Sequence, residues 1–312
     1  MSDDRPILGI LLMLGFCAIA PIGDAIAKVL GTTVPLGEVI LVRFAVQAIV
    51  LVPIVILTRR VWRMSGRLLR LVLLRTVLHI AAIGSMFTAL KFLPLADAVA
   101  IAFVMPFIML ILSKYILNEE VGIRRILACV VGFVGTLLVI QPSFINVGLP
   151  ALWPLAVAVL FSFFILTTRQ IAHIVDPVSL QAVSGVMACL FIMPALWVGQ
   201  IYGIETLTLI EPNILEWTLL LSIGILGTGA HLLMTWSLRY APAATLVPMQ
   251  YLEIPIATGI GWLVFRDLPN NLAALGICIT VCAGLYIIMR EQATARAKAR
   301  ARQNDQAAQL PG

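Results

Sequence analysis

A single carboxylate inside a long apolar run is the residue with the clearest chemical potential in this sequence. Glu253 lies in the segment VPMQYLEIP, between Pro248 and Pro255, and Gln250 and Tyr251 are its polar neighbours. An ionisable group deep in an apolar segment is costly and needs a partner or a task. Glu253 is therefore predicted to bind an amine or to carry a proton; the alternative is a structural carboxyl bonded to a neighbouring segment.

Two basic residues inside apolar runs complement this acid. Arg43 and Gln47 are four positions apart, as are Arg75 and His79, so each pair shares one face if its segment is helical. Either arginine can bind a carboxylate through two parallel hydrogen bonds. Both can equally form structural ion pairs, and His79 can serve as a proton relay or as a donor between helices.

A polar stripe is expected at Thr228, His231 and Thr235, with Trp236 beside it. In a bilayer such a stripe faces protein or a cavity and not lipid. His231 and Trp236 are therefore candidate substrate contacts.

A local salt bridge is expected between Asp24 and Lys28, which are also four positions apart. Glu38 lies close enough in the chain to join them. This group is predicted to stand at the mouth of a cavity.

Motifs of enzymatic chemistry are missing from the sequence. It has no H-E-x-x-H, G-x-S-x-G, Walker A or G-x-G-x-x-G motif. Its three histidines are dispersed, and its five cysteines all lie in apolar runs without a C-x-x-C. We therefore expect no metal, no cofactor and no enzymatic activity.

The elements that carry these residues are ten apolar runs. The chain is 61% hydrophobic and only 12% charged, against about 25% charged in soluble proteins. A helix needs about 20 apolar residues to cross a bilayer, and uniformly apolar runs of this length exclude barrel strands. The expected spans are 7–30, 35–58, 68–91, 94–117, 122–140, 149–171, 177–200, 214–239, 242–265 and 271–289.

The positive charge of +6 is distributed as in a membrane protein and not as in a nucleic-acid-binding protein. An even number of spans places both termini on one side. Segments on that side carry Arg5, the arginines between 59 and 70, Arg124, Arg125, Arg169, Arg239 and the basic residues from 290 to 302, whereas the other side carries only Lys28, Lys91 and Arg266. This bias predicts that both termini are cytoplasmic.

An internal repeat relates the two halves of the chain. Segments FTALKFLPLADAV and TWSLRYAPAATLV share four identities at a shift of 148 positions, in which Leu90, Pro94, Ala96 and Val99 match Leu238, Pro242, Ala244 and Val247. Pro106 similarly answers Pro255. Because five spans is an odd number, the second copy begins on the opposite side of the membrane, which is the inverted-repeat architecture of many secondary transporters.

The expected domains are a first five-helix repeat over 1–145, a second over 146–290, and a flexible cytoplasmic tail over 291–312 that anionic lipid attracts.

The chain resembles the EamA-type members of the drug/metabolite transporter superfamily. The resemblance rests on the five-plus-five arrangement, on Arg43–Phe44, and on LPLADAVAIAFVMPFIMLILSKYILNEE over 93–120. It implies metabolite transport, often export, through a central cavity surrounded by helices one to four and six to nine. In the second copy Arg266–Asp267 replaces the acidic pair Glu119–Glu120.

Together these observations predict an all-α, ten-helix inverted-repeat transporter in a bacterial inner membrane. It would carry small amphipathic or zwitterionic metabolites, such as amino acids, by alternating access, with export as the expected direction. Pro106 and Pro255 are the expected gating positions. Its partners would be the substrate, lipid and a coupling proton, and the chain would be a monomer or weak homodimer.

Three alternatives stay open. Because related carriers take up S-adenosylmethionine, uptake of such a nucleoside-type metabolite is the first. A channel and a membrane-embedded enzyme are the other two. The unequal polar residues of the two halves favour a carrier over a channel.

Overall fold

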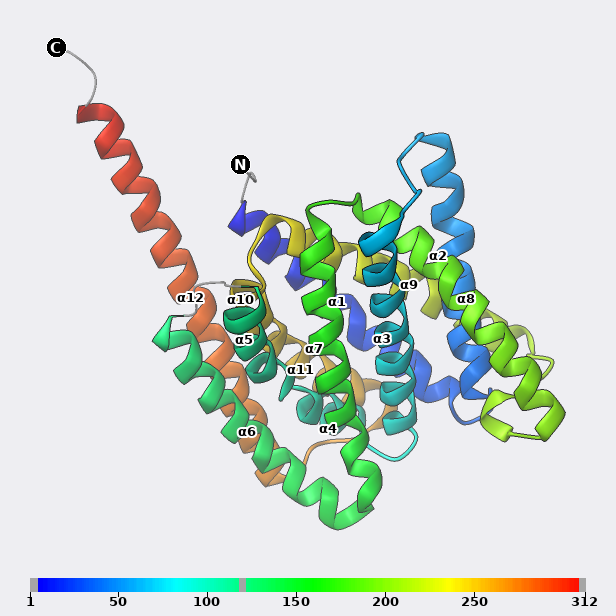
Figure 1. Cartoon of the computed structure of the whole chain (residues 1–312). Coiled ribbons are helices and arrows are strands. Elements are labelled where there is room, and N and C mark those ends of the chain that lie inside the picture. The colour runs from blue at the N-terminus through cyan, green and yellow to red at the C-terminus, as the bar shows by residue number, and fades with distance from the viewer. Residues whose placement is uncertain (1–4, 118–121, 309–312) are drawn as a thin grey trace.

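A computed structural model describes residues 5–117 and 122–308, and this part of the chain consists of helices joined by short connections, without strands (Figure 1). In chain order the elements are α1 (Pro6–Leu30), α2 (Leu36–Leu57), α3 (Gly66–Leu90), α4 (Leu95–Ala102), α5 (Met105–Ile116), α6 (Ile123–Val147), the 3₁₀ turn Leu149–Leu152, α7 (Trp153–Ala172), α8 (Pro177–Tyr202), the 3₁₀ turn Glu205–Leu207, α9 (Ile214–Tyr240), α10 (Ala243–Leu246), the 3₁₀ segment Val247–Leu252, α11 (Glu253–Ile260), the π-helical turn Gly261–Phe265, and α12 (Asn271–Ala308).

The expected fold class is confirmed as an all-α polytopic membrane protein. Eight segments of the described chain are long and apolar enough to cross a bilayer, and they include α4 with α5 as one span. The expected ninth span is the broken segment from α10 to the π-helical turn, and α12 begins with a shorter apolar stretch, Asn271–Tyr286. The ten expected spans therefore correspond to ten helical segments in the same order.

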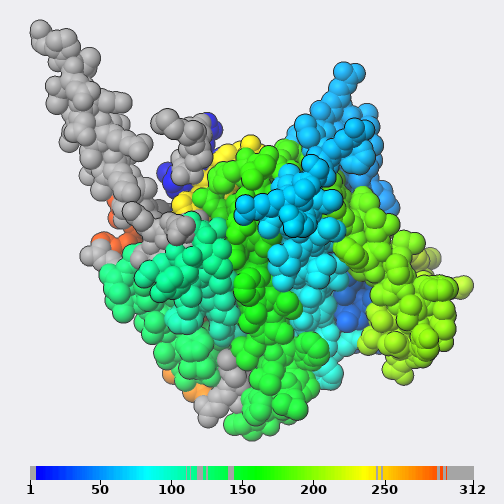
Figure 2. All heavy atoms as spheres, in the orientation of Figure 1, coloured from blue at the N-terminus to red at the C-terminus, as the bar shows by residue number. Residues whose placement is uncertain are grey.

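The helices associate mainly in pairs far apart in sequence. Along their lengths α1 packs on α9, α3 on α7, α2 on α8, and α6 on α12. In the expected order of the two five-helix repeats, α1 corresponds to α7 and α3 corresponds to α9. The α1–α9 pair therefore corresponds to the α7–α3 pair. Figure 2 shows α7 in green between the teal α6 and the cyan α3 on one continuous face.

Close approach of α6 and α12 depends on glycines. A Cβ added at Gly135 would stand 2.6 Å from the carbonyl oxygen of Gly276, which is too close for two real atoms. Small residues are the usual means of bringing two membrane helices into contact. This pair forms one edge of the molecule in Figure 1.

Two helix boundaries differ from those expected. α6 continues through Pro142 to Val147, where Gly148, at φ 76°, ends it; the sequence placed the break at 141. α12 continues as a helix to Ala308, into the segment expected to be a flexible tail. Alanine, arginine and glutamine all favour helix, so this composition extends a helix beyond its apolar part.

Both central prolines stand at discontinuities. α4 ends at Ala102, and α5 begins at Met105 with Pro106 as its second residue. The chain likewise changes from a 3₁₀ segment to α11 at Glu253, two residues before Pro255. Proline cannot donate the backbone hydrogen bond that would continue a helix. Both breaks lie at the cavity, whose lining includes Phe103 beside the first and Glu253 at the second.

The polarity of the interior follows the membrane pattern. Side chains such as Ile49, Leu190 and Ile225 are exposed, whereas Arg75 and Gln181 are fully buried. Polar groups inside a bilayer avoid lipid and bond to one another or face a cavity. The buried polar residues therefore locate the candidate site.

Candidate functional site

A cavity lies between α1, α2, α3, α4, α7, α9 and the broken segment around α11. Its empty volume is about 840 Å³, including the space at its open mouth. Most of its wall is apolar, with rings from Phe16, Phe87 and Phe161. Its polar lining consists of five side chains, which are Asp24, Arg43, His231, Gln250 and Glu253.

The acidic wall of the cavity joins residues more than two hundred positions apart. Asp24 comes from α1, and Glu253 is the first residue of α11, where the proline-rich backbone changes helix type. Glu253 is only 9% exposed. The helices that carry the two carboxyl groups, α1 and α11, pack directly on each other. Within the described residues neither side chain has a hydrogen bond or salt bridge.

The basic wall is formed by Arg43 and His231. The Arg43 Nη2 lies 3.1 Å from Nδ1 of His231, which is also 3.0 Å from the Gly227 carbonyl oxygen. Arginine can only donate and a carbonyl oxygen can only accept, so Nδ1 bonds to one of these two neighbours according to the imidazole tautomer. The His231 Nε2 and the Arg43 Nη1 are both buried without a hydrogen-bond partner in the described structure.

Gly227 fixes the position of the guanidinium. A Cβ added at this glycine would lie 2.8 Å from the Arg43 Nε. Only a residue without a side chain lets Arg43 lie flat against α9 at this depth. Nothing in the sequence pattern around Gly227 signals this role.

Gln250 completes the polar lining. Its side chain is fully buried, and neither the amide nitrogen nor the amide oxygen has a partner in the described structure. An unsatisfied buried polar group costs about 1–3 kcal/mol. Gln250, Arg43 and His231 together thus present unpaired polar atoms to the cavity region, as a binding site does.

A second polar layer lies beyond the cavity, toward the N-terminal end of α3. The Arg75 Nε donates to Oγ1 of Thr168 at 2.8 Å, and its Nη1 donates to Oγ of Ser184 at 2.9 Å. The guanidinium carbon lies 4.6 Å from the centre of the Phe164 ring. We call the residues of this layer the inner seal; its contacts join α3 to α7 and α8.

His79 and Gln47 also belong to the inner seal and do not line the cavity. The His79 ring stacks on Phe164, with centroids 4.4 Å apart, and lies 4.3 Å from the His231 ring. Gln47 donates to the Gln181 carbonyl oxygen at 2.7 Å. Gln181 in turn donates to the His231 carbonyl oxygen at 3.0 Å.

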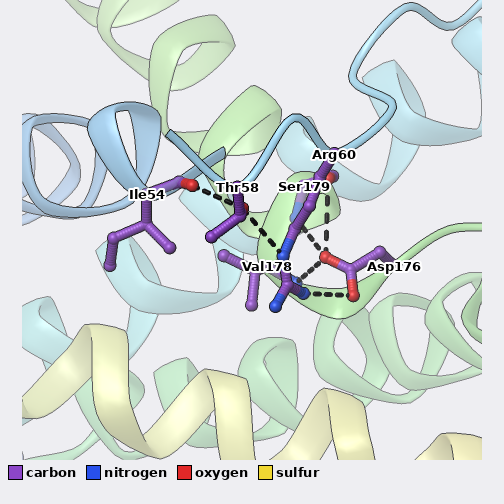
Figure 3. Close-up of polar contacts among 6 residues, drawn as sticks. All are labelled: Ile54, Thr58, Arg60, Asp176, Val178 and Ser179. Carbon is purple, nitrogen blue, oxygen red and sulfur yellow. Dashed lines mark hydrogen bonds and ion pairs between the residues drawn. The ribbon is translucent and has the colours of Figure 1, made fainter. Parts of the chain in front are cut away.

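An ion pair closes the same end of the molecule (Figure 3). The Arg60 Nη1, after α2, lies 2.6 Å from Oδ1 of Asp176, which precedes α8. The other Asp176 oxygen accepts backbone N–H bonds from Val178 and Ser179, both at 3.1 Å, and so caps α8.

The charge state of Asp176 follows from these contacts. Partial burial alone would raise its pKa, but the hydrogen bond from Arg60 and those from the backbone outweigh burial and hold the pKa below 3.8. Asp176 is therefore ionised at neutral pH. Its ion pair with Arg60 ties the α2–α3 connection to the α7–α8 turn.

Two other candidate residues also lie away from the cavity. The Tyr251 ring packs against Gly132 on α6 and lies 5.5 Å from the Phe103 ring, centre to centre. Trp236 packs against an apolar cluster that includes Leu51. Neither side chain is part of the cavity lining.

The expected salt bridge between Asp24 and Lys28 does not form. The Lys28 Nζ instead lies 3.3 Å from the Asp267 carboxylate and donates to the Leu93 carbonyl oxygen at 3.0 Å. It also lies 4.9 Å from the centre of the Phe265 ring. Lys28 therefore contacts residues distant in sequence and not Asp24, and Asp24 lines the cavity.

The cavity and the inner seal lie at different depths. The lining residues of α3 lie between Ala82 and Phe87, and those of α1 extend from Phe16 to Asp24, so most of them lie in the halves that run toward Leu90 and Leu30. The beginning of α1 and the end of α12 lie together on the other side of the molecule, at the top of Figure 1, as does the α2–α3 connection. The inner seal therefore separates the cavity from the side on which the two ends of the chain lie.

Comparison with known proteins gives one family. The model of the EamA-like transporter family matches residues 7–141 and, a second time, residues 148–290. A solved crystal structure that is 18% identical superposes with a TM-score of 0.65 over 91% of this chain and 96% of the other, which shows a shared fold.

Three relatives have transporter names. A riboflavin transporter from Brucella anthropi is 27% identical, over 72% of this chain and 78% of its own length. An S-adenosylmethionine uptake transporter from Rickettsia prowazekii is 26% identical, over 89% and 91%. A pseudopaline exporter from Pseudomonas aeruginosa is 24% identical, over 88% and 91%.

Proposed function

Because this chain belongs to the EamA-like transporter family, we propose that it carries small zwitterionic metabolites across the membrane through the cavity described above. The family is one of transporters and not of enzymes, and membership places the chain in the drug/metabolite transporter superfamily. Its spans and relatives make it a multi-pass bacterial membrane protein. The substrate class and the mechanism are the proposal.

One observation carries the substrate class. The cavity has two carboxyl groups on one wall, Asp24 and Glu253, and a guanidinium on another, Arg43. An ammonium binds between carboxylates, and a carboxylate binds a guanidinium through charge-assisted hydrogen bonds. A substrate with both groups, such as an amino acid, satisfies both walls. Apolar rings would hold the rest of the molecule.

Alternating access is the proposed mechanism. The inner seal closes one end of the cavity, and the charge bias along the chain predicts that this end is cytoplasmic. The arrangement supports an outward-facing state of a carrier, whose halves, 1–145 and 146–290, rock against each other. The breaks at Pro106 and Pro255 supply bending points, and export is the proposed direction.

S-adenosylmethionine uptake is the second candidate. This metabolite has an ammonium, a carboxylate and a sulfonium, so it carries two cationic groups and one anionic group. That count matches two carboxylates and one arginine. Relatives with this printed name extend over 86–89% of the chain. The same site chemistry therefore supports both candidates, which differ in substrate size and in direction.

A counterflow assay tests the proposal. Proteoliposomes loaded with an unlabelled zwitterion should accumulate the labelled one, and the initial rate should saturate. Analogues lacking the ammonium or the carboxylate should compete at least about tenfold more weakly, because each lost contact is worth about 1.4 kcal/mol or more. Non-saturable flux without counterflow would indicate a channel, and equal competition by the analogues would reject the zwitterion class.

A further inference from the structure

The cavity lining contains two carboxyl groups and only one guanidinium, so acidic groups exceed basic groups by one. Asp24 on α1 and Glu253 on α11 both line it, and α1 packs directly on α11. Opposite them stands one guanidinium, Arg43, whose charge interacts with that of Asp24. The His231 Nδ1 lies 3.1 Å from the Arg43 Nη2, and a buried second positive charge this close to a guanidinium is strongly disfavoured, so the imidazole is neutral.

No other charged group neutralises the pair in the described structure. Lys28, on the same helix as Asp24, is held by Asp267 and by a backbone carbonyl. Arg75 and His79 on α3 lie in the inner seal. Asp97 on α4 and Tyr251 in the 3₁₀ segment are not part of the lining, and the buried Cys17 thiol donates to the Met249 carbonyl oxygen.

Two carboxylates facing one guanidinium leave a net charge of minus one if both are ionised. In a water-poor interior such an excess charge is very costly, so like carboxyl groups sharing a site do not both ionise. One added cation restores neutrality. That cation can be a proton on one carboxyl group or the net positive charge of a bound substrate such as S-adenosylmethionine, whereas a zwitterion adds no net charge and binds with the proton retained.

Gln250 indicates that a ligand and not a fixed structural partner completes the site. Its amide is fully buried, lines the cavity beside Glu253 and has no partner at either atom in the described structure. The amide oxygen can accept from an ammonium, while the nitrogen can donate to a carboxylate. A zwitterion would therefore satisfy Gln250 together with the unpaired Nη1 of Arg43.

We propose that Asp24 and Glu253 form one cation site that holds either a single proton or the single net positive charge of a bound substrate, but never both. When a substrate with one net positive charge enters, the carboxyl O–H bond breaks and its proton passes to water in the cavity. When that substrate leaves, water returns a proton, whereas a substrate without net charge leaves the proton in place. Mutually exclusive occupancy therefore couples one proton to each molecule of a singly cationic substrate; this coupling rests on the proposed function, whereas the shared proton does not.

The first experiment needs no substrate. Dicyclohexylcarbodiimide enters membranes and modifies protonated carboxyl groups, and peptide mass spectrometry locates the adduct in the purified full chain. We expect one adduct per protein, on Asp24 or on Glu253, with labelling lost as the pH is raised. Asp267, whose carboxylate is paired with Lys28, should remain unmodified and serves as the internal control. Absence of an adduct at both cavity carboxyls would overturn the proposal.

Substitutions then separate a shared proton from two independent ones. In Glu253→Gln the remaining Asp24 faces Arg43 alone, so its labelling should fall at least tenfold, and Asp24→Asn should do the same to Glu253. Unchanged labelling of the remaining carboxyl in either variant refutes sharing. If one variant fails to fold, the other gives the same answer, and labelling of the wild-type chain decides whether a protonated carboxyl exists at all.

A transport experiment distinguishes an error in the proposed cation site from an error in the proposed function. In proteoliposomes, S-adenosylmethionine and a panel of amino acids serve as probes, and a pH-sensitive dye counts protons released per molecule bound. Release of one proton per S-adenosylmethionine, and of none per neutral amino acid, supports the exchange, and binding of S-adenosylmethionine without proton release overturns it. Labelling of the pair without transport of any zwitterion would instead reject the proposed substrate class while leaving the proton site intact.

Discussion

The cavity and the inner seal contain the same kinds of polar side chain in opposite states. In the inner seal, Arg75 reaches hydroxyl acceptors on two neighbouring helices and Gln47 reaches the backbone of α8. In the cavity, Arg43 keeps one nitrogen without an acceptor and Gln250 keeps its whole amide unpaired within the described structure. Hydrogen bonds between helices hold the first region together, whereas the second leaves its groups for a ligand. The difference teaches that an unsatisfied polar group, and not a polar group as such, marks the site.

Accessibility from outside should give the largest contrast. In a cysteine-free background, Gly23→Cys places a thiol in the cavity at a position where an added Cβ meets nothing within 4 Å. We expect an impermeant thiol reagent to label it in intact cells. Ser184→Cys, in the fully buried inner seal, should remain unlabelled.

Glu205→Cys calibrates this contrast, because Glu205 is exposed in the α8–α9 connection on the side opposite to the chain ends. It should label in intact cells. Labelling of Gly23→Cys and Glu205→Cys only after lysis would show that the protein has the opposite orientation, and labelling of Ser184→Cys in intact cells would contradict the inner seal.

Neutralising Glu253 in the cavity should have the next largest effect, which is on the transport rate. Glu253→Gln keeps the shape and removes the charge, and a neutral amide is cheaper to bury than a carboxylate. Transport driven by a pH gradient should fall at least about tenfold, equivalent to about 1.4 kcal/mol. The matched control Glu205→Gln changes an exposed glutamate and should transport normally. Wild-type rates for Glu253→Gln, with normal expression, would make Glu253 structural.

Removing the two central prolines should slow transport several-fold without loss of expression. Alanine at 106 and 255 restores a backbone donor at each break, so both helices should stiffen. The double variant Pro106→Ala, Pro255→Ala should keep its affinity for substrate in a binding assay, because neither proline lines the cavity. Unchanged initial rates in the double variant would rule out the hinge role.

Loss of one hydroxyl group in the inner seal, that of Thr168, should lower the free energy of unfolding. Thr168→Val leaves the Nε of Arg75 without its acceptor, which should lower the free energy of unfolding by about 1–3 kcal/mol. Thr167→Val is the matched control, since the Thr167 hydroxyl bonds only to its own helix at Phe163. Thermal unfolding in detergent compares the two, and equal melting temperatures would count against the proposed importance of the Arg75 contact.

The smallest effect is expected at the ion pair of Figure 3. The Asp176 pKa is lowered in the folded protein, so its contribution to stability is complete above its usual value of 3.8 and is lost as the pH falls through the folded pKa. Because solvent screens a partly exposed pair, the contribution is roughly 0.2–1 kcal/mol.

Asp176→Asn tests this sign. Asparagine also caps helices, so the substitution removes the charge while keeping the cap of α8. The variant should melt slightly below the wild type at neutral pH, and the difference should vanish in acid. A difference that grows as the pH falls would show that the ion pair is not its source.

The sequence could predict the spans and part of the cavity lining because those inferences are local. Each run has the length and apolarity that a bilayer demands, and all ten reappear as helical segments in order. Glu253, Arg43, Gln250 and His231 stand out for a similarly local reason, since a polar side chain in an apolar run must face protein or a cavity. Four of the five polar lining residues can thus be identified from the sequence alone.

Which polar groups lie together in the cavity follows only from the tertiary structure. The four-residue spacing predicted a salt bridge between Asp24 and Lys28. In the structure Lys28 pairs instead with Asp267, more than two hundred positions away, and Asp24 lines the cavity. Spacing likewise treated Arg43 and Arg75 alike, but the rotation and depth of α2 and α3 place one at the cavity and the other in the inner seal. Membrane length and hydropathy are properties of one segment, whereas pairing depends on where separate helices bring their side chains.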